Sequence, residues 1–379
     1  MPIPTNPTPT RKTDRYRGRD GARTGPAVAS TGPGAGESSL RMTAVTPSAD
    51  PAVAVEVLAA ARSVTVLCHI QPDADTLGSG LALAQVLHRR GIPVQVSFAE
   101  PDELPASMRS LPGAEHLVPP AQVAAQVDLL VTVDCGSAGR LGALADRLDG
   151  AQTVLVIDHH RSNTRFGTVN LIDDTADSTT SVLTRVFDAW GADIDRDIAH
   201  CLFAGLVTDT GCFRWGGAAS HLLADRLLAT GIDGAGITRT LMDTHPFGWL
   251  SMLSRVLGSA RLEPAAAHGA GLVYAFVHSA DADGLRSEEV ESVIDVVRTT
   301  AEADVAAVFK QSRTEPQRWM VSLRSRDSGV GTGDAVDVAR VATRLGGGGH
   351  RYAAGYTTHG TSDDLVAALL AELAADGTN

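Results

Sequence analysis

The chain of 379 residues is long enough for two domains, and its content of 44% hydrophobic and 20% charged residues is typical of a globular protein. Its formal net charge of -12 disfavours a protein that wraps long duplex nucleic acid, which requires a basic stripe, but permits a short nucleotide ligand. No uninterrupted apolar segment approaches the roughly 18 residues of a membrane span, so we expect no membrane partner.

The first 50 residues are rich in Pro, Thr, Gly and Arg and lack a periodic apolar pattern. Such a segment cannot bury enough surface to offset its conformational entropy, so we predict that residues 1–50 are disordered. Basic residues near the N-terminus are followed by Gly, Ala and Ser rather than by an apolar core, which does not fit a signal peptide. The four cysteines lack zinc-binding spacing and are predicted to be free thiols. A cytoplasmic location is expected.

After this segment, apolar runs alternate with helical patterns. The runs at 64–68, 129–133 and 154–157 have the length and composition of buried parallel strands. Their alternation with helices predicts an α/β fold with a doubly wound, mostly parallel sheet. From Ser178 the pattern becomes helical, and a second cycle of strands and helices begins near Gly271. This second cycle predicts a smaller α/β domain.

Each of the three apolar runs ends in residues that can bind metals. The first is followed by His69, Asp73 and Asp75, the second by Asp134, and the third by the stretch Asp158-His159-His160. Ligands of open α/β sheets bind at the carboxyl ends of the strands, where these side chains are expected to meet. Taken singly, each aspartate could equally be a helix cap, because aspartates favour helix N-termini.

Several carboxylates that converge on one sheet edge would repel one another unless cations neutralise them. A pair of divalent ions, roughly 3.5–4 Å apart, is the simplest resolution, because two metals can share a bridging carboxylate and activate water for attack on phosphorus. Oxygen ligands mixed with imidazole suit Mn²⁺, Mg²⁺ or a related first-row ion better than thiophilic metals, and we expect Mn²⁺, with Mg²⁺ or Co²⁺ as alternatives. The sequence therefore predicts two divalent metal ions.

The order and spacing of these residues resemble the motifs of the DHH phosphoesterase superfamily. A second resemblance, to the signature of the associated DHHA1 domain, covers residues 345–355. The combination is most similar to the branch of bifunctional nanoRNases (oligoribonucleases) and pAp phosphatases. The motifs are His69-x3-Asp73-x-Asp75, Asp134, Asp158-His159-His160 and Thr208-Asp209-Thr210-Gly211, followed by Gly347-Gly348-Gly349-His350 and Ala353-Ala354-Gly355.

The resemblance also implies a role for each site residue. Asp134 would bridge the two metals, Asp158 would orient a histidine, and His160 would face the substrate phosphate. These three are the expected catalytic residues. The first metal would be held by His69, Asp73 and Asp134, and the second by Asp75, Asp134, His159 and Asp209.

Substrate binding is expected in the second domain. A glycine run leaves backbone N–H groups free to approach a phosphate, as glycine-rich loops before helices do, although it can equally be a hinge. Arg324 resembles the phosphate-contacting arginine of the family, whereas Arg326 is interpreted as merely nearby. The expected substrate-binding residues are Arg324, Ser325, Gly347, Gly348, Gly349 and His350.

The resemblance divides the chain into four parts, with a cleft between the two α/β domains. A homodimer is one option for the oligomeric state. The predicted parts are a disordered extension (1–50), a DHH catalytic metal-binding domain (51–240), a helical connector (241–262) and a DHHA1 substrate-binding domain (263–379).

The implied enzyme is a phosphohydrolase with two metals. It would degrade very short RNA oligonucleotides to nucleoside monophosphates and dephosphorylate 3′-phosphoadenosine 5′-phosphate (pAp) to AMP. One alternative with the same chemistry is a phosphodiesterase for cyclic di-AMP or its linear product pApA, which would present phosphates to the same metals. An alternative of another class is a non-catalytic nucleotide-binding module, although a sensor would not need all six candidate ligands.

Overall fold

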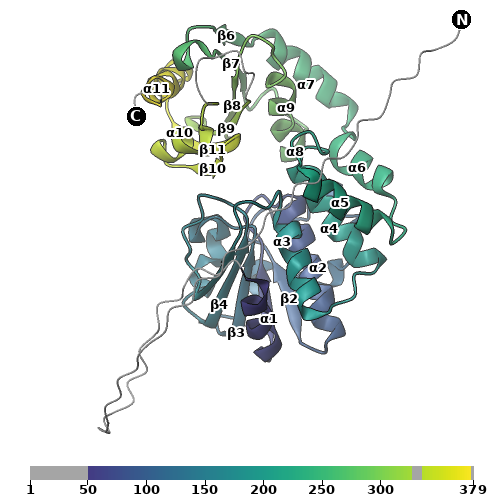
Figure 1. Cartoon of the computed structure of the whole chain (residues 1–379). Coiled ribbons are helices and arrows are strands. Elements are labelled where there is room, and N and C mark those ends of the chain that lie inside the picture. The colour runs from purple at the N-terminus through teal and green to yellow at the C-terminus, as the bar shows by residue number, and fades with distance from the viewer. Residues whose placement is uncertain (1–49, 327–334, 377–379) are drawn as a thin grey trace, which may run out of the picture. The chain divides into compact units, whose positions relative to one another are not determined.

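The computed structural model describes residues 50–326 and 335–376 (Figure 1). A parallel five-stranded sheet with the order β2-β1-β3-β4-β5 lies in the N-terminal half of the described chain. Strands β1 and β3 are buried at nearly every position and β4 over its last five residues, which explains their continuous apolar runs. The strands are β1 (Val64–Leu67), β2 (Val94–Ser97), β3 (Val127–Val133), β4 (Ala151–Asp158) and β5 (Val169–Ile172).

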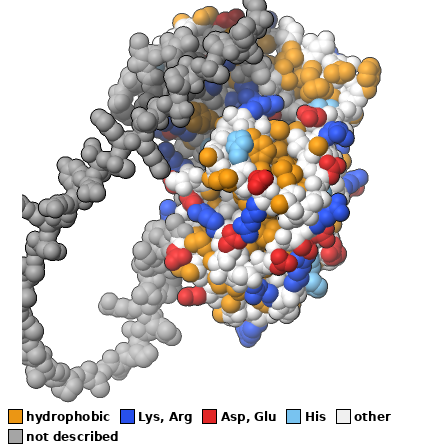
Figure 2. Space-filling view, turned by 45° about the vertical axis from the view of Figure 1, so that its right-hand side comes forward, with side chains coloured by type: hydrophobic (Ala, Val, Ile, Leu, Met, Phe, Trp, Pro, Cys, Tyr) orange, Lys and Arg blue, Asp and Glu red, His pale blue; other side chains and the backbone are white. Residues whose placement is uncertain are grey.

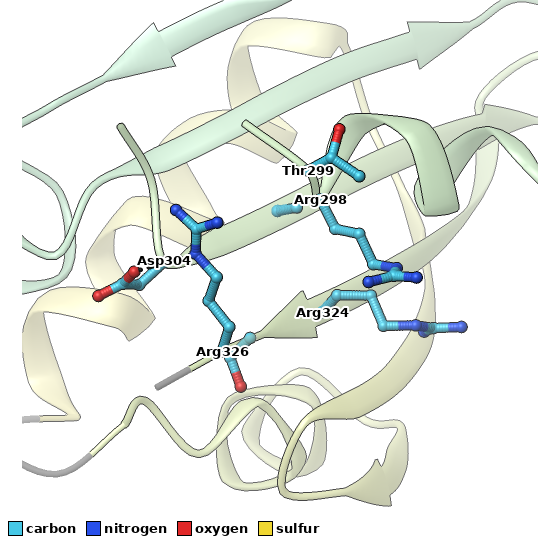
Figure 3. A pocket seen from close by; sticks show the side chains of 7 residues that line it. Arg298, Thr299, Asp304, Arg324 and Arg326 are labelled. Carbon is cyan, nitrogen blue, oxygen red and sulfur yellow. Dashed lines mark hydrogen bonds and ion pairs between the residues drawn. The ribbon is translucent and has the colours of Figure 1, made fainter. Parts of the chain in front are cut away.

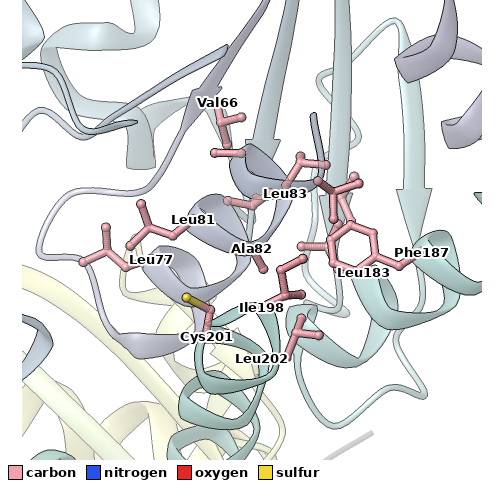
Figure 4. Close-up of a cluster of buried hydrophobic side chains, with 14 of the residues drawn as sticks. Val66, Leu77, Leu81, Ala82, Leu83, Leu183, Phe187, Ile198, Cys201 and Leu202 are labelled. Atoms are coloured by element: carbon pink, nitrogen blue, oxygen red, sulfur yellow. The ribbon is translucent and has the colours of Figure 1, made fainter. Parts of the chain in front are cut away.

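Three helices that pack on one another form the main core of this half: α2 (Ala74–Arg89), α3 (Thr179–Trp190) and α4 (Arg196–Asp209). Figure 4 shows side chains from all three in one apolar cluster, which includes Leu81, Phe187 and Leu202. α2 and α4 approach closely because Gly78 has no side chain. A Cβ at this position would lie 2.4 Å from the carbonyl oxygen of Cys201.

Other helical elements lie outside this core, and the last of them, α7 (Phe247–Gly258), packs on β7 (Leu272–Val277) of the C-terminal sheet. The segment after β3 is a 3-10 helix, η4 (Ala138–Arg147), and Gly142 interrupts it with φ 57° and ψ -133°. The others are α1 (Pro51–Ala60), η1 (Ala106–Met108), η2 (Ala114–His116), η3 (Pro120–Gln122), α5 (Ala218–Leu228), α6 (Gly234–Met242) and α7 (Phe247–Gly258).

The C-terminal half contains a six-stranded sheet with the order β10-β11-β9-β8-β7-β6. The pair β7 and β8 is parallel and the other pairs are antiparallel. Its strands are β6 (Arg261–Glu263), β7 (Leu272–Val277), β8 (Val305–Gln311), β9 (Arg318–Ser325), β10 (Gly348–His350) and β11 (Ala353–His359). Its helices are η5 (Ala267–Gly269), α8 (Ser287–Glu291), α9 (Val293–Val297), α10 (Val338–Arg344) and α11 (Ser362–Ala375).

Each sheet has apolar clusters of its own, so the predicted class of a parallel α/β sheet followed by a second, smaller α/β unit is confirmed. The predicted domain limits stay predictions. The predicted disorder of residues 1–50 falls almost entirely outside the described residues. Among the described helices, none combines the length and apolar character that crossing a membrane requires. Figure 2 shows acidic and basic side chains interspersed on one face of the molecule.

Candidate metal centre

The ends of three neighbouring strands bring the acidic and histidine residues together. Asp158 is the last residue of β4, Asp134 follows β3 directly, and His69 follows β1 by two residues. The backbone N–H of Asp134 donates a hydrogen bond to the carbonyl of Ile157 (3.0 Å), which continues the ladder to the sheet edge. Asp134 has a φ of 57°, a left-handed conformation in which the chain turns as the strand ends.

His69 lies between two carboxylates. Its Nε2 is 3.5 Å from Asp73 Oδ2 and 3.5 Å from Asp134 Oδ2. Its Nδ1 lies 2.8 Å from the carbonyl oxygen of Ile70 and 3.1 Å from Arg140 Nη2, so the other ring nitrogen, Nε2, faces the carboxylates. The two carboxylate oxygens of Asp73 have different partners. Oδ1 accepts hydrogen bonds from backbone N–H groups in the first turn of α2, and Oδ2 faces His69. The capping and metal interpretations of Asp73 are therefore compatible.

His159 is surrounded by three carboxylates. Its Nε2 lies 3.1 Å from Asp209 Oδ2, 3.5 Å from Asp134 Oδ1 and 3.8 Å from Asp75 Oδ2. Its Nδ1 faces the carbonyl oxygen of Ala176 at 3.1 Å, so Nδ1 is the donor. Nε2 is buried and makes no hydrogen bond within residues 50–326 and 335–376, and its position among three carboxylates fits a bound cation.

Asp134 belongs to both groups of ligands. Its Oδ2 faces His69 and its Oδ1 faces His159. The donor atoms within each group lie within 4.8 Å of one another. The mixture of carboxylate oxygen and imidazole nitrogen suits a divalent ion of the first transition row. The groups are His69, Asp73 and Asp134, and Asp75, Asp134 and His159, with Asp209 beside His159.

The pKa values reflect an excess of buried negative charge. Burial raises the pKa of Asp75 well above its ordinary range, and the charges of Asp209 and Asp134 add to this effect. Burial also raises the pKa of Asp209 to about 6. Burial lowers the pKa of His69, but Asp73 and Asp134 outweigh it and bring the value to about 10. Ligation requires a neutral imidazole, so cation binding here would release protons.

Asp75 is held by the N-terminus of α3. Its Oδ2 accepts a hydrogen bond from the backbone N–H of Thr179 (2.6 Å), and its Oδ1 accepts one from that of Thr180 (3.0 Å). The hydroxyl of Thr179 donates to Asp134 Oδ1 (3.0 Å). A helix N-terminus stabilises a carboxylate, so α3 keeps a fully buried acid in place. Sequence reasoning missed both threonines, although the polar run that opens α3 was a signal.

Asp158 orients His160. Its Oδ1 accepts from His160 Nδ1 (2.7 Å) and from the backbone N–H of His159 (2.8 Å), while its Oδ2 accepts from the Asn163 side chain (2.5 Å). Burial lowers the pKa of His160, but the charge of Asp158 outweighs it and raises the value. Because Nδ1 of His160 is bonded to Asp158, Nε2 is the second N–H donor of the charged His160 ring. Asn163 is another residue that sequence reasoning missed.

Replacing Asp158 with Asn should lower kcat by about 10- to 100-fold, the usual effect of losing a group that orients a residue in a metal centre. Loss of the Asp158 charge lowers the pKa of His160, so the basic limb of the pH–kcat profile should move to lower pH. Steady-state kinetics across pH measure both effects. A profile displaced to higher pH, or an unchanged kcat, would contradict this role.

The glycine run differs from the prediction of a loop before a helix. It follows α10 and forms β10, which pairs with β11. A Cβ at Gly347 would lie 2.0 Å from the carbonyl oxygen of Gly355, and one at Gly349 (φ 141°) would lie 2.6 Å from that of Ala353. These glycines are required for close approach of the two strands. Gly348 has more room, because its nearest contact would be Ser162 Oγ at 3.7 Å.

The predicted substrate-binding residues occupy two places. The ring of His350 stacks on that of His160 (centroids 4.2 Å apart, 20° between planes) and lies 4.6 Å from that of His159. Arg324 and Ser325 instead line a cavity of about 310 Å³, shown in Figure 3 and called the arginine pocket below. The other residues that line this pocket are Arg298, Thr299, Asp304, Ala306 and Arg326.

Comparison with known proteins agrees with the resemblance inferred from the motifs. Residues 63–206 match the model of the DHH family, N-terminal domain, and residues 269–375 match that of the DHHA1 domain. The chain is 30% identical to the bifunctional oligoribonuclease and PAP phosphatase NrnA of Thermus thermophilus, over 82% of this chain and 88% of that protein. It is 22% identical to the probable bifunctional oligoribonuclease and PAP phosphatase NrnA of Streptococcus mutans, over 78% of this chain and 89% of that protein.

A solved structure shows the same fold. The crystal structure of an exopolyphosphatase-related protein from Bacteroides fragilis aligns with a TM-score of 0.73 and 20% identity, over 86% of this chain and 95% of that one. Two domain models matched in order, together with a relative aligned over most of both chains, confirm the family. The chain therefore belongs to the DHH family of phosphoesterases, in which an N-terminal DHH domain is followed by a DHHA1 domain.

Proposed function

We propose that the chain is a phosphohydrolase with two divalent metal ions, Mn²⁺ in preference to Mg²⁺ or Co²⁺. It degrades very short oligoribonucleotides to nucleoside monophosphates and dephosphorylates pAp to AMP. The observation that carries the proposal is the position of Asp134, whose two carboxylate oxygens each lie 3.5 Å from a different histidine Nε2. The names of the two curated relatives support the substrate class.

In this proposal the first ion is held by His69, Asp73 and Asp134. Paired divalent cations generate a nucleophile from water near neutral pH and offset charge on the phosphoryl oxygens. The buried, unpartnered Nε2 of His159 supports a second ion at that position. The second ion is held by Asp75, Asp134, His159 and Asp209.

The protein's own groups then act on the phosphate. His160, fixed by Asp158, donates from Nε2 to a phosphate oxygen or to the leaving oxygen. His350 stacks on His160, and burial together with the charges of His160 and His159 lowers the pKa of His350 to about 3. His350 is therefore neutral at physiological pH and offers a hydrogen bond without adding charge. The two histidines present one charged and one uncharged donor.

Mn²⁺ should raise the melting temperature of the protein, because a ligand that binds only the folded state stabilises it, by about 2.7 kcal/mol at 100-fold excess over Kd. Mn²⁺ should raise the melting temperature of the variant His159→Ala by less, since this variant lacks a proposed ligand of the second ion. The control His221→Ala changes an exposed histidine of α5 and should respond as the wild type does. Differential scanning fluorimetry measures the shifts; an equal Mn²⁺ response in all three proteins would refute the role of His159.

A substrate panel tests the function itself. The purified protein with Mn²⁺ is assayed on RNAs of increasing length from the dinucleotide upward, on pAp and on cyclic di-AMP. We expect the highest kcat/KM on the shortest RNAs and on pAp, and loss of activity when Mn²⁺ is chelated. Hydrolysis of cyclic di-AMP alone would assign a different substrate. Nucleotide binding without hydrolysis would make the chain a binding module.

A further inference from the structure

Trp215 is a large aromatic residue that lies exposed beside the candidate metal centre. It is 51% exposed, whereas the other three tryptophans of the chain are partly or fully buried. Its Nε1 donates a hydrogen bond to the backbone carbonyl of Asp209 (2.5 Å), and the carboxylate of Asp209 lies 3.1 Å from Nε2 of His159. The indole is therefore bonded to the main chain of a candidate metal ligand.

The orientation of the indole ring is fixed at two places. The hydrogen bond from Nε1 holds the pyrrole part of the ring, and the benzene part packs on Gly211, where a Cβ would lie 2.1 Å from Cη2 of Trp215. Any side chain larger than that of Gly211 would displace the ring. A ring held in one orientation offers contact area to a ligand at a small cost in conformational entropy.

The turn that presents Trp215 has a strained backbone. Gly211, Cys212 and Phe213 follow one another with φ values of 53°, 58° and 62°, and this left-handed region is unfavourable for the two that are not glycine. The turn is tied to the end of α4, because the backbone N–H of Cys212 donates to the carbonyl of Val207 (2.7 Å). Backbone strain clusters at ligand-binding sites, so this turn points to a binding role.

The position of Trp215 also indicates which kind of ligand it fits. Exposed apolar residues that occur singly need no explanation, but this one is fixed in orientation, follows a strained turn and is bonded to a candidate metal ligand. The guanidinium carbon of Arg298, one of the residues of the arginine pocket, lies 4.9 Å from the centroid of the ring, so a planar group already reaches it. The bases of the proposed substrates are planar too, and bases stack on aromatic rings and on guanidinium planes.

We propose that Trp215 stacks on a base of the substrate and so positions the nucleotide at the candidate metal centre. This inference rests on the proposed function and adds to it a residue that determines substrate specificity. Stacking recognises the face of a base rather than its hydrogen-bonding edge, so it accepts all four bases. Phosphodiesters that lack a base are then poorer substrates than dinucleotides of any sequence.

The test compares a dinucleotide with two analogues that each lack the base at one of the two positions. The wild type should hydrolyse the intact dinucleotide with a kcat/KM about 5- to 150-fold higher than that of one of the analogues, the range for losing one stacked base. Trp215→Ala should reduce this ratio to less than about twofold, because no ring remains to stack. Trp215→Phe keeps an aromatic face without the Nε1 donor and should retain part of the ratio.

The ratio separates stacking from a structural role. A variant that only disturbs Asp209 lowers kcat/KM on all three compounds by the same factor and leaves the ratio as in the wild type, a result that would overturn the proposal. Trp215→Leu fills more of the space over Gly211 and serves as the non-aromatic variant should alanine prevent folding. The matched control is Phe247→Ala, which removes an exposed aromatic ring from α7 and should keep the wild-type ratio.

The wild type alone distinguishes this proposal from the proposed function. Hydrolysis of the intact dinucleotide without preference over either analogue would remove the stacking role and leave the proposed function in place. No hydrolysis of the dinucleotide or of pAp by the Mn²⁺-loaded protein would remove both.

Discussion

Replacing Asp134 with Asn should abolish most of the activity while leaving the protein folded. The amide keeps the shape of the side chain but removes the charge and one of the two oxygens that face His69 and His159. Removing a single group that stabilises transition-state charge lowers kcat by about 10²–10³-fold. Because Asp134 serves both ligand groups, we expect a loss at the upper end of this range or beyond, together with weaker Mn²⁺ binding.

The measurements are kcat/KM on pAp and Mn²⁺ affinity by isothermal titration calorimetry, with circular dichroism as a check on folding. The control is Asp146→Asn, which removes the same charge from an exposed side chain of η4 and should behave as the wild type. A folded Asp134→Asn protein that keeps wild-type kcat/KM would show that the shared carboxylate has no part in the reaction.

Replacing Gly205 with Ala should damage both stability and activity. A Cβ on this residue of α4 would lie 2.5 Å from Asp75 Oδ1 and 2.6 Å from Thr180 Cγ2. Overpacking of this kind destabilises a folded protein by about 1–3 kcal/mol. The displaced atom belongs to a candidate metal ligand, and a shift of about 1 Å in an active site can lower the rate by about 10²-fold.

Chemical denaturation gives the free energy of unfolding, and kcat/KM gives the effect on catalysis. Gly258→Ala is the matched control, because Gly258 ends α7 and a Cβ there would meet no atom of the described residues within 4 Å. Alanine has the higher helix propensity by about 1 kcal/mol, so this control should be neutral or slightly stabilised. A Gly205→Ala protein as stable and active as the control would show that α4 does not need to approach Asp75 so closely.

The strand-end residues could be predicted from the sequence because of how parallel sheets are built. Strands buried on both faces consist of uninterrupted apolar runs, so the first polar residue after each run marks the sheet edge. His69, Asp134 and Asp158 were identified in this way. Asp209 is different: it ends a helix, and only its resemblance to a family motif connected it with the strands.

Residues that act through packing or through the backbone left a weaker signal. Thr179 and Thr180 hold Asp75 through main-chain N–H groups, which any residue type could supply. Gly205 is required by a contact between two helices that are distant along the chain.

The glycine run could be predicted to lie close to another group, but its composition does not identify that group. Its composition indicates that backbone must approach something closely, but not whether the neighbour is a phosphate or another strand. At Gly347 and Gly349 the neighbour is β11, so the expected loop is a paired strand. The strand β5 (Val169–Ile172) also has no distinct signal, because four residues are too few to display a period.

The most direct test of the two-metal proposal is anomalous X-ray diffraction at the manganese edge, from crystals grown with Mn²⁺. The proposal predicts two peaks per chain, one among His69, Asp73 and Asp134 and the other among Asp75, Asp134, His159 and Asp209. A single peak, or two peaks that do not both contact Asp134, would contradict it.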